Sequence, residues 1–152
     1  SVSRALQRGV RLDVGHGTAS LSFAVAKRAI ELGILPHTIS SDIYCRNRIS
    51  GPVYSLANVM SKFLAMGMSL PQVIECVTAN AADGLRLKKK GRLQPGLDAD
   101  LTLFTLKRQP TVLVDAENDS LQAEQMLVPL AAIRAGKGYM TEQGSAEHAF
   151  DF

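Results

Sequence analysis

The stretch His37-Thr38-Ile39-Ser40-Ser41-Asp42 constrains this chain most, because it predicts a very short strand that ends on a carboxylate. Pro36 has a fixed φ and biases the residue before it towards extended geometry. A polar, irregular run follows over 44–48. Proteins of the α/β class place their chemistry at the carboxyl ends of strands, facing such loops. Asp42 is therefore a candidate functional residue, and a capping role in the next turn is the open alternative.

A strand, a helix and a second strand occupy the region that ends at Asp42. Apolar and polar residues alternate over 10–14, which predicts a strand, and apolar residues recur at helical spacing over 20–32. The second strand is the one that ends at Asp42. This βαβ pattern predicts two parallel strands that lie next to each other.

His16 follows the first strand just as Asp42 follows the second. Gly15 and Gly17 flank it, and two glycines let the backbone turn sharply and let a ligand approach closely. If the strands are parallel neighbours, His16 and Asp42 converge at one end of the sheet. The alternative is a turn histidine that is bonded to nearby backbone.

Two further helices and then a β-rich segment are predicted. An apolar face repeats at helical spacing over 54–66, and Ser69 with Gln72 forms a capping box that starts a helix over 69–78. Turn residues become dense from Gly91. We therefore divide the chain into a segment of strands and helices, a β-rich segment and a poorly ordered tail, over 1–90, 91–142 and 143–152. The β-rich segment holds predicted strands over 101–106, 111–114, 126–134 and from 139.

Composition limits the partners. The length of 152 residues suits one domain, or one and a half small ones. Much of the net charge of +3 lies in the run 86–92, which could bind phosphate or nucleic acid. A solvated turn after a helix is the favoured interpretation, because no aromatic residues are interleaved. Nucleic acid is therefore not an expected partner.

Cysteine content and hydropathy bear on the compartment. Cys45 and Cys76 form no CxxC pattern and suggest no disulfide framework, so a reducing, cytoplasmic setting is expected. No apolar run approaches membrane-spanning length and no signal peptide is present, so no membrane partner is expected. The first residues start without Met inside a helical pattern, which predicts a piece of something longer.

Three motifs, taken together, resemble the C-terminal part of the amidohydrolase superfamily. Those motifs are Asp13-Val14-Gly15-His16-Gly17, Thr38-Ile39-Ser40-Ser41-Asp42 and Gly91-Arg92-Leu93-Gln94-Pro95-Gly96-Leu97-Asp98-Ala99-Asp100-Leu101. The nearest similarity is to the dihydroorotase-like amidohydrolase/deacetylase branch. The resemblance covers nearly the whole chain, and the three motifs are specific as a set although each alone is weak.

The resemblance implies a fold and a chemistry. The fold would be the C-terminal portion of a (β/α)8 TIM-type barrel, from its seventh strand onward, plus a small β-sandwich segment. Asp42 would match the aspartate of strand eight, which binds a metal, zinc or a similar divalent ion, and takes a proton from the attacking water. His16 and Gly17 would face the substrate, a small-molecule amide or ester.

Most of the family's metal ligands have no counterpart here. The His-x-His pair of the first strand, the bridging lysine and two further histidines would all lie upstream. A hydrolytic zinc site usually needs three or more protein ligands, and this chain offers one. We therefore expect a hydrolase fragment that is inactive alone, that needs the missing N-terminal barrel portion and that forms a homo-oligomer. The alternative is a catalytically dead fragment that acts only as an oligomerising or interaction module.

Overall fold

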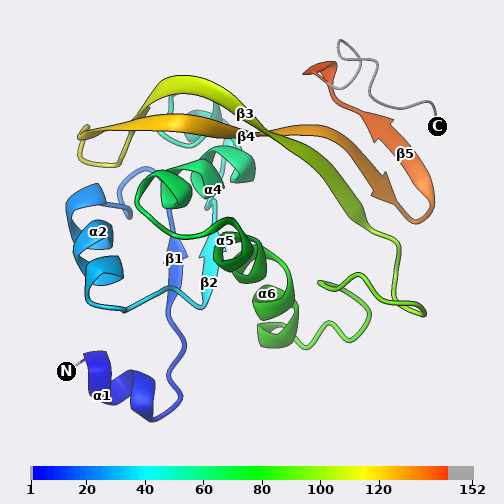
Figure 1. Ribbon diagram of the computed structural model, residues 1–152, viewed down its shortest axis with the longest axis horizontal. Coiled ribbons are helices and arrows are strands. Elements are labelled where there is room, and N and C mark those ends of the chain that lie inside the picture. The colour runs from blue at the N-terminus through cyan, green and yellow to red at the C-terminus, as the bar shows by residue number, and fades with distance from the viewer. Residues whose placement is uncertain (1, 144–152) are drawn as a thin grey trace.

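Two parallel strands, β1 (Asp13–Gly15) and β2 (Thr38–Ser40), lie at the centre of the computed structural model, which describes residues 2–143 (Figure 1). Helix α2 (Phe23–Glu31) joins them, and Val14 pairs with Ile39 in the register. The predicted βαβ unit is therefore confirmed. Strand β1 is shorter than predicted, because the residues before it link the sheet to α1 (Val2–Gln7).

A short helix, α3 (Cys45–Ser50), replaces the irregular run that the sequence predicts after Asp42. The side chain of Asn47 is buried, and its Oδ1 accepts a hydrogen bond from the N–H of Tyr44 at 2.8 Å. This local bond closes the first turn in place of an apolar stripe. The segment carries no apolar periodicity, which is why its helix could not be read from the pattern.

Three helices follow, α4 (Leu56–Ala65), α5 (Leu70–Val77) and α6 (Ala79–Gly84). The predicted capping box is confirmed at the start of α5. The N–H of Ser69 donates to Oε1 of Gln72 at 2.8 Å, and the N–H of Gln72 lies 3.5 Å from the Ser69 hydroxyl. Two orphan donors at the helix start are thus satisfied reciprocally.

The rest of the described chain is a three-stranded antiparallel sheet of β3 (Leu101–Val114), β4 (Ser120–Arg134) and β5 (Lys137–Met140). The separate strands predicted over 101–106 and 111–114 are wrong, since β3 is continuous. The register between β3 and β4 shifts twice, and Pro110 and Pro129 lie at those shifts. Proline cannot donate to a ladder, so irregular pairing accommodates it without ending the strand.

The long β3–β4 hairpin arches over the helices and packs on α4 (Figure 1). One apolar core runs through both parts. It joins Phe63 and Val73 of the helices to Leu113 and Leu127 of the hairpin. The boundary predicted near 91 therefore separates types of secondary structure but not two cores, and the division into domains stays a prediction. Within residues 2–143 no helix is long and apolar enough to cross a bilayer. The predicted tail lies outside the described residues from 144 on.

Candidate functional site

The loops that follow β1 and β2 lie side by side. The N–H of His16 donates to the carbonyl of Ser40 at 3.2 Å, and the N–H of Gly17 donates to the carbonyl of Ser41 at 3.1 Å. Because the strands are parallel, both loops leave the sheet at its carboxyl edge. Asp42 is thereby brought beside Gly17.

Asp42 presents an exposed carboxylate on a constrained backbone. Its φ of 48° lies in the left-handed region, which is uncommon for residues other than glycine. Its carbonyl accepts a hydrogen bond from Nδ2 of Asn47 at 3.0 Å. Within residues 2–143 its carboxylate oxygens take part in no hydrogen bond or ion pair. These oxygens are therefore available to an ion, a water molecule or a substrate.

Gly17 lets the backbone approach that carboxylate closely. A Cβ added to Gly17 would lie 2.6 Å from Oδ2 of Asp42, and the φ of Gly17 is +52°. Both facts exclude a side chain at this position without rearrangement. The substrate-binding role of Gly17 stays a prediction, and its place beside Asp42 is compatible with that role.

His16 points into the interior and is fully buried. Its Nδ1 lies 3.0 Å from the carbonyl oxygen of Gly17, and its Nε2 lies 2.7 Å from Nζ of Lys62. Burial lowers the pKa of His16, and the charge of Lys62 lowers it further. The two loop backbones meet as expected, but the imidazole does not share the exposed face with Asp42. Substrate binding by His16 stays a prediction that its burial does not favour.

Lys62 of α4 is a buried cation with three partners. Its Nζ donates to Nε2 of His16, to the carbonyl of Pro52 and to the carbonyl of Val114, each at 2.7 Å. Burial lowers the pKa of Lys62 to about 8, while the nearby charge of Asp115 acts in the opposite direction. The buried Lys62 ammonium therefore links three segments of the chain, those that contain His16, Pro52 and Val114, by hydrogen bonds.

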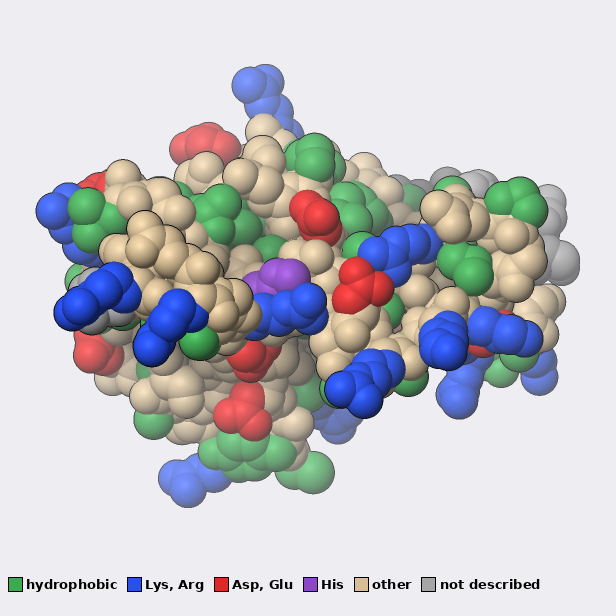
Figure 2. All heavy atoms as spheres, turned by 90° about the horizontal axis from the view of Figure 1, so that it is seen from below, with side chains coloured by type: hydrophobic (Ala, Val, Ile, Leu, Met, Phe, Trp, Pro, Cys, Tyr) green, Lys and Arg blue, Asp and Glu red, His purple; other side chains and the backbone are tan. Residues whose placement is uncertain are grey.

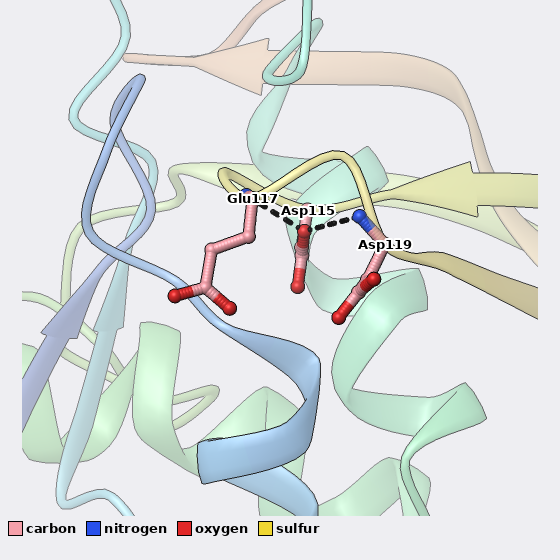
Figure 3. A group of neighbouring side chains, drawn as sticks. All are labelled: Asp115, Glu117 and Asp119. Carbon is pink, nitrogen blue, oxygen red and sulfur yellow. Dashed lines mark hydrogen bonds between the residues drawn. The ribbon is translucent and has the colours of Figure 1, made fainter.

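The turn between β3 and β4 carries a group of acidic side chains, Asp115, Glu117 and Asp119 (Figure 3). Oδ1 of Asp115 accepts hydrogen bonds from the N–H groups of Glu117 at 2.8 Å and Asp119 at 2.9 Å, and Oδ2 accepts one from Phe23 at 2.7 Å. Burial alone would raise the pKa of Asp115, but these backbone donors outweigh it and lower the pKa. The Asp115 carboxylate thus already accepts hydrogen bonds from two residues of the turn and from the first residue of α2.

The acidic group of Asp115, Glu117 and Asp119 is the only set of three or more His, Cys, Asp or Glu residues with metal-ligand spacing in the part of the chain that the structure describes. Asp42 does not belong to it. A divalent ion fits the free carboxylate of Asp42 as one ligand, and the other ligands would have to come from outside the described residues.

A cleft of about 640 Å³ opens between the loop before α4 and the end of β3. Thr18 lies on its wall, and Oγ1 of Thr18 is 2.5 Å from the hydroxyl of Tyr44, so this contact joins the loops after β1 and β2. The remaining lining residues include Asn58, Lys62 and Asp115. Asp42 is not among the residues that line this cleft.

The basic run over 86–92 is partly neutralised. Lys90 pairs with Asp98 at 2.9 Å and also with Asp100, and Arg92 pairs with Asp83 at 2.7 Å. Figure 2 shows basic side chains spread along one face of the molecule and mixed with acidic ones. This distribution is compatible with the expectation that nucleic acid is not a partner, which stays a prediction.

Sequence analysis did not single out Lys62 or Asp115. Lys62 is buried, but it lies off the apolar face that the sequence predicts over 54–66, which runs through Leu56, Val59, Met60, Phe63 and Leu64. A lysine outside the apolar face of an amphipathic helix is expected to be exposed, so the pattern gave no sign of its burial. Asp115 gave no signal either, because an Asp in a hairpin turn is common whether or not it is buried.

Comparison with known proteins agrees with this geometry. The model of the amidohydrolase family matches residues 2–135. A deacetylase of Enterococcus faecalis is 41% identical over 136 residues, which cover 90% of this chain and 37% of that protein. The crystal structure of an adenine deaminase superposes with a TM-score of 0.90 at 40% identity, covering 91% of this chain and 38% of that one. The crystal structure of a dihydroorotase gives a TM-score of 0.83 at 36% identity, covering 92% and 37%.

These matches agree with the resemblance seen in the three sequence motifs. The chain spans less than two fifths of the length of each of these relatives, at 37%, 38% and 37%. They align with nearly all of the described residues, including both loops that flank Asp42. The chain belongs to the amidohydrolase family.

Proposed function

We propose that the complete protein is a metal-dependent hydrolase of an amide or ester, of the deacetylase or dihydroorotase-like kind. The observation that carries this proposal is the free carboxylate of Asp42 at the carboxyl edge of a parallel strand pair, with the backbone of Gly17 against it. The described relatives, a deacetylase, an adenine deaminase and a dihydroorotase, support a small-molecule substrate.

In this proposal the chain is the C-terminal portion of a (β/α)8 barrel with a β-sandwich segment. Strands β1 and β2 are the last two barrel strands, and the β3–β4–β5 sheet is the sandwich segment. Within the described residues β1 and β2 pair only with each other, so each has one open edge where a barrel requires a neighbour. The missing N-terminal barrel portion would supply those neighbours.

Asp42 has two tasks in the proposed reaction. The carboxylate of Asp42 would hold a divalent metal, zinc or a similar ion, together with ligands from the remainder of the protein. A bound divalent ion supplies a water whose pKa is lowered to about 7. The same carboxylate would take the proton from the attacking water and pass it to the leaving group of the amide or ester.

Metal removal tests this proposal. We expect the complete protein to lose at least about 90% of its turnover of small N-acyl amides after dialysis against a chelator, because metal-activated water is the nucleophile. Added zinc or manganese should restore turnover. The measurement is turnover against metal content, and the control is dialysis without chelator. Full turnover by metal-free protein would contradict the proposal.

The open strand edges and exposed apolar residues support a second candidate, an oligomerising or interaction module without catalysis. Large apolar side chains such as Val25, Ile49 and Leu93 are 70%, 76% and 83% exposed. This chain alone should therefore sediment as a homo-oligomer or as aggregate at micromolar concentration. A monodisperse monomer with a cooperative melt would contradict that expectation.

The cytoplasm remains the proposed location. Cys45 is an exposed thiol and Cys76 a buried one, and neither forms a disulfide in the structure. Burial raises the pKa of the Cys76 thiol, which keeps it protonated and unreactive. Free thiols of this kind suit a reducing compartment.

A further inference from the structure

The hydrogen bonds around His16 define its protonation. Nζ of Lys62 is an ammonium group, which offers only donors, so Nε2 of His16 must present its lone pair to it. The proton of the neutral ring then resides on Nδ1, which donates to the carbonyl of Gly17 at 3.0 Å. Burial and the charge of Lys62 both lower the pKa of His16, so a neutral ring agrees with the network.

The Lys62 ammonium, which contacts Nε2 of His16, is fixed in place by the fold. The three donors of the Lys62 ammonium have three acceptors, His16 Nε2 and the carbonyls of Pro52 and Val114. Those partners belong to the loop after β1, the loop before α4 and the end of β3. Since none of the three donors is spare, the ammonium cannot shift without breaking a buried hydrogen bond.

On its other side, the His16 ring contacts Gly17, which lies beside the free carboxylate of Asp42. Nδ1 of His16 donates to the carbonyl of Gly17. The N–H of Gly17 donates to the carbonyl of Ser41, the residue before Asp42. A Cβ on Gly17 would meet Oδ2 of Asp42 at 2.6 Å, so the glycine backbone is one wall of the space around that oxygen. Rotation of the Gly17 peptide would change that wall.

We propose that His16 is a positioning residue, which donates from Nδ1 to the Gly17 carbonyl while Lys62 fixes its Nε2, and so sets the Gly17 backbone against the Asp42 carboxylate. This inference rests on the function proposed above for Asp42. It gives His16 a role that its complete burial permits, since the ring acts through Gly17 without touching substrate.

The ring tautomer of the unsubstituted protein is the first test. Nitrogen-15 spectra of the complete protein at pH 7 should show His16 as a neutral ring protonated on Nδ1, assigned by the signal that His16→Asn removes. In Lys62→Met the ring should lose this single tautomer, whereas Lys27→Met, a change of an exposed lysine in α2, should leave it unaltered. A ring protonated on Nε2, or an imidazolium, in the unsubstituted protein would overturn the proposal.

Two substitutions of His16 separate its two hydrogen bonds. His16→Asn can place an amide donor where Nδ1 lies, which keeps the bond to Gly17 but loses the acceptor for Lys62. His16→Gln can place an amide oxygen where Nε2 lies, which keeps the bond to Lys62 but loses the donor to Gly17. A merely structural histidine would suffer from both changes alike, whereas a positioning histidine suffers mainly from the second.

We expect His16→Gln to lower kcat about 10–100-fold with KM nearly unchanged, because a small misplacement of a catalytic group has effects of that size. His16→Asn should keep kcat within about threefold, since the hydrogen bond to Gly17 survives. Metal retention during dialysis against a chelator is the second readout, and His16→Gln should retain less metal than His16→Asn. Equal losses of kcat and melting temperature in both variants, or a change in KM alone, would overturn the proposal.

Asp42→Asn in the same assays distinguishes failure of this inference from failure of the proposed function. Wild-type turnover in Asp42→Asn would remove the proposed function and the inference together. If Asp42→Asn is inactive while His16→Gln keeps wild-type kcat and metal retention, only the positioning role of His16 is wrong.

Discussion

Replacing Asp42 with asparagine is expected to lower kcat of the complete protein by at least about a thousandfold, because the variant loses both a metal ligand and the group that receives the proton. An amide has nearly the shape of a carboxylate but cannot accept that proton at neutral pH. Asparagine also tolerates the left-handed backbone seen at this position, with φ of 48°. The expected loss is therefore chemical and not a loss of folding.

The fold should survive this change. The carboxylate of Asp42 makes no hydrogen bond or ion pair within residues 2–143, and only its carbonyl is held, by Asn47. The free energy of unfolding should accordingly change by no more than about 0.5 kcal/mol, as it does for an ordinary exposed substitution. The melting temperature should therefore stay close to that of the wild type.

Asp98→Asn is the matched control for Asp42→Asn. It changes an exposed aspartate whose partner is Lys90 at 2.9 Å, remote in sequence from either strand of the parallel pair. Its kcat should stay within about twofold of wild type, because exposed ion pairs contribute little. The comparison consists of steady-state kinetics and thermal melts on all three proteins. An Asp42→Asn protein as active as Asp98→Asn would show that Asp42 carries no chemistry.

The parts of the fold that the sequence predicts are those set by local periodicity. The strand, helix and strand up to Asp42 could be read because alternation and helical spacing each require only neighbouring residues. The capping box at Ser69 and Gln72 could be read for the same reason. Helix α3 could not, because it is held by the side chain of Asn47 and not by an apolar stripe.

The site divides in the same way. The loops carrying Gly17 and Asp42 were predicted to meet, since parallel strands bring their carboxyl ends together. The inward direction of His16 could not be predicted, because it depends on Lys62, which lies 46 residues away in another element. Long-range polar contacts of this kind leave no periodic trace in a sequence.

Replacing Asp115 with alanine should have the largest effect on stability, lowering the free energy of unfolding by about 3 kcal/mol or more. Three backbone N–H groups would lose their acceptor, the buried one of Phe23 and the half-buried ones of Glu117 and Asp119. The buried ammonium of Lys62 would also lose the nearby negative charge that opposes the burial effect on its pKa. Unfolding in urea, followed by circular dichroism, measures the difference.

Asp119→Ala is the matched control for Asp115→Ala, since it removes an exposed carboxylate from the same turn while its backbone N–H still donates to Asp115. It should cost no more than about 0.5 kcal/mol. Equal destabilisation by the two substitutions would mean that the turn needs acidic charge in general and not the three hydrogen bonds of Asp115.

The effect of Asp115 should depend on pH with a defined sign. The folded protein lowers the pKa of this carboxyl below its ordinary value of 3.8, so the folded state holds the proton less readily than the unfolded chain does. The stabilisation is therefore fully present above the ordinary pKa and is lost as the pH falls through the folded value. The difference in unfolding free energy between wild type and Asp115→Ala should be constant from pH 5 to 7 and shrink below about pH 4. A difference that grows on acidification would show that the carboxyl is bound in its protonated form, which would reverse the role of the three backbone donors.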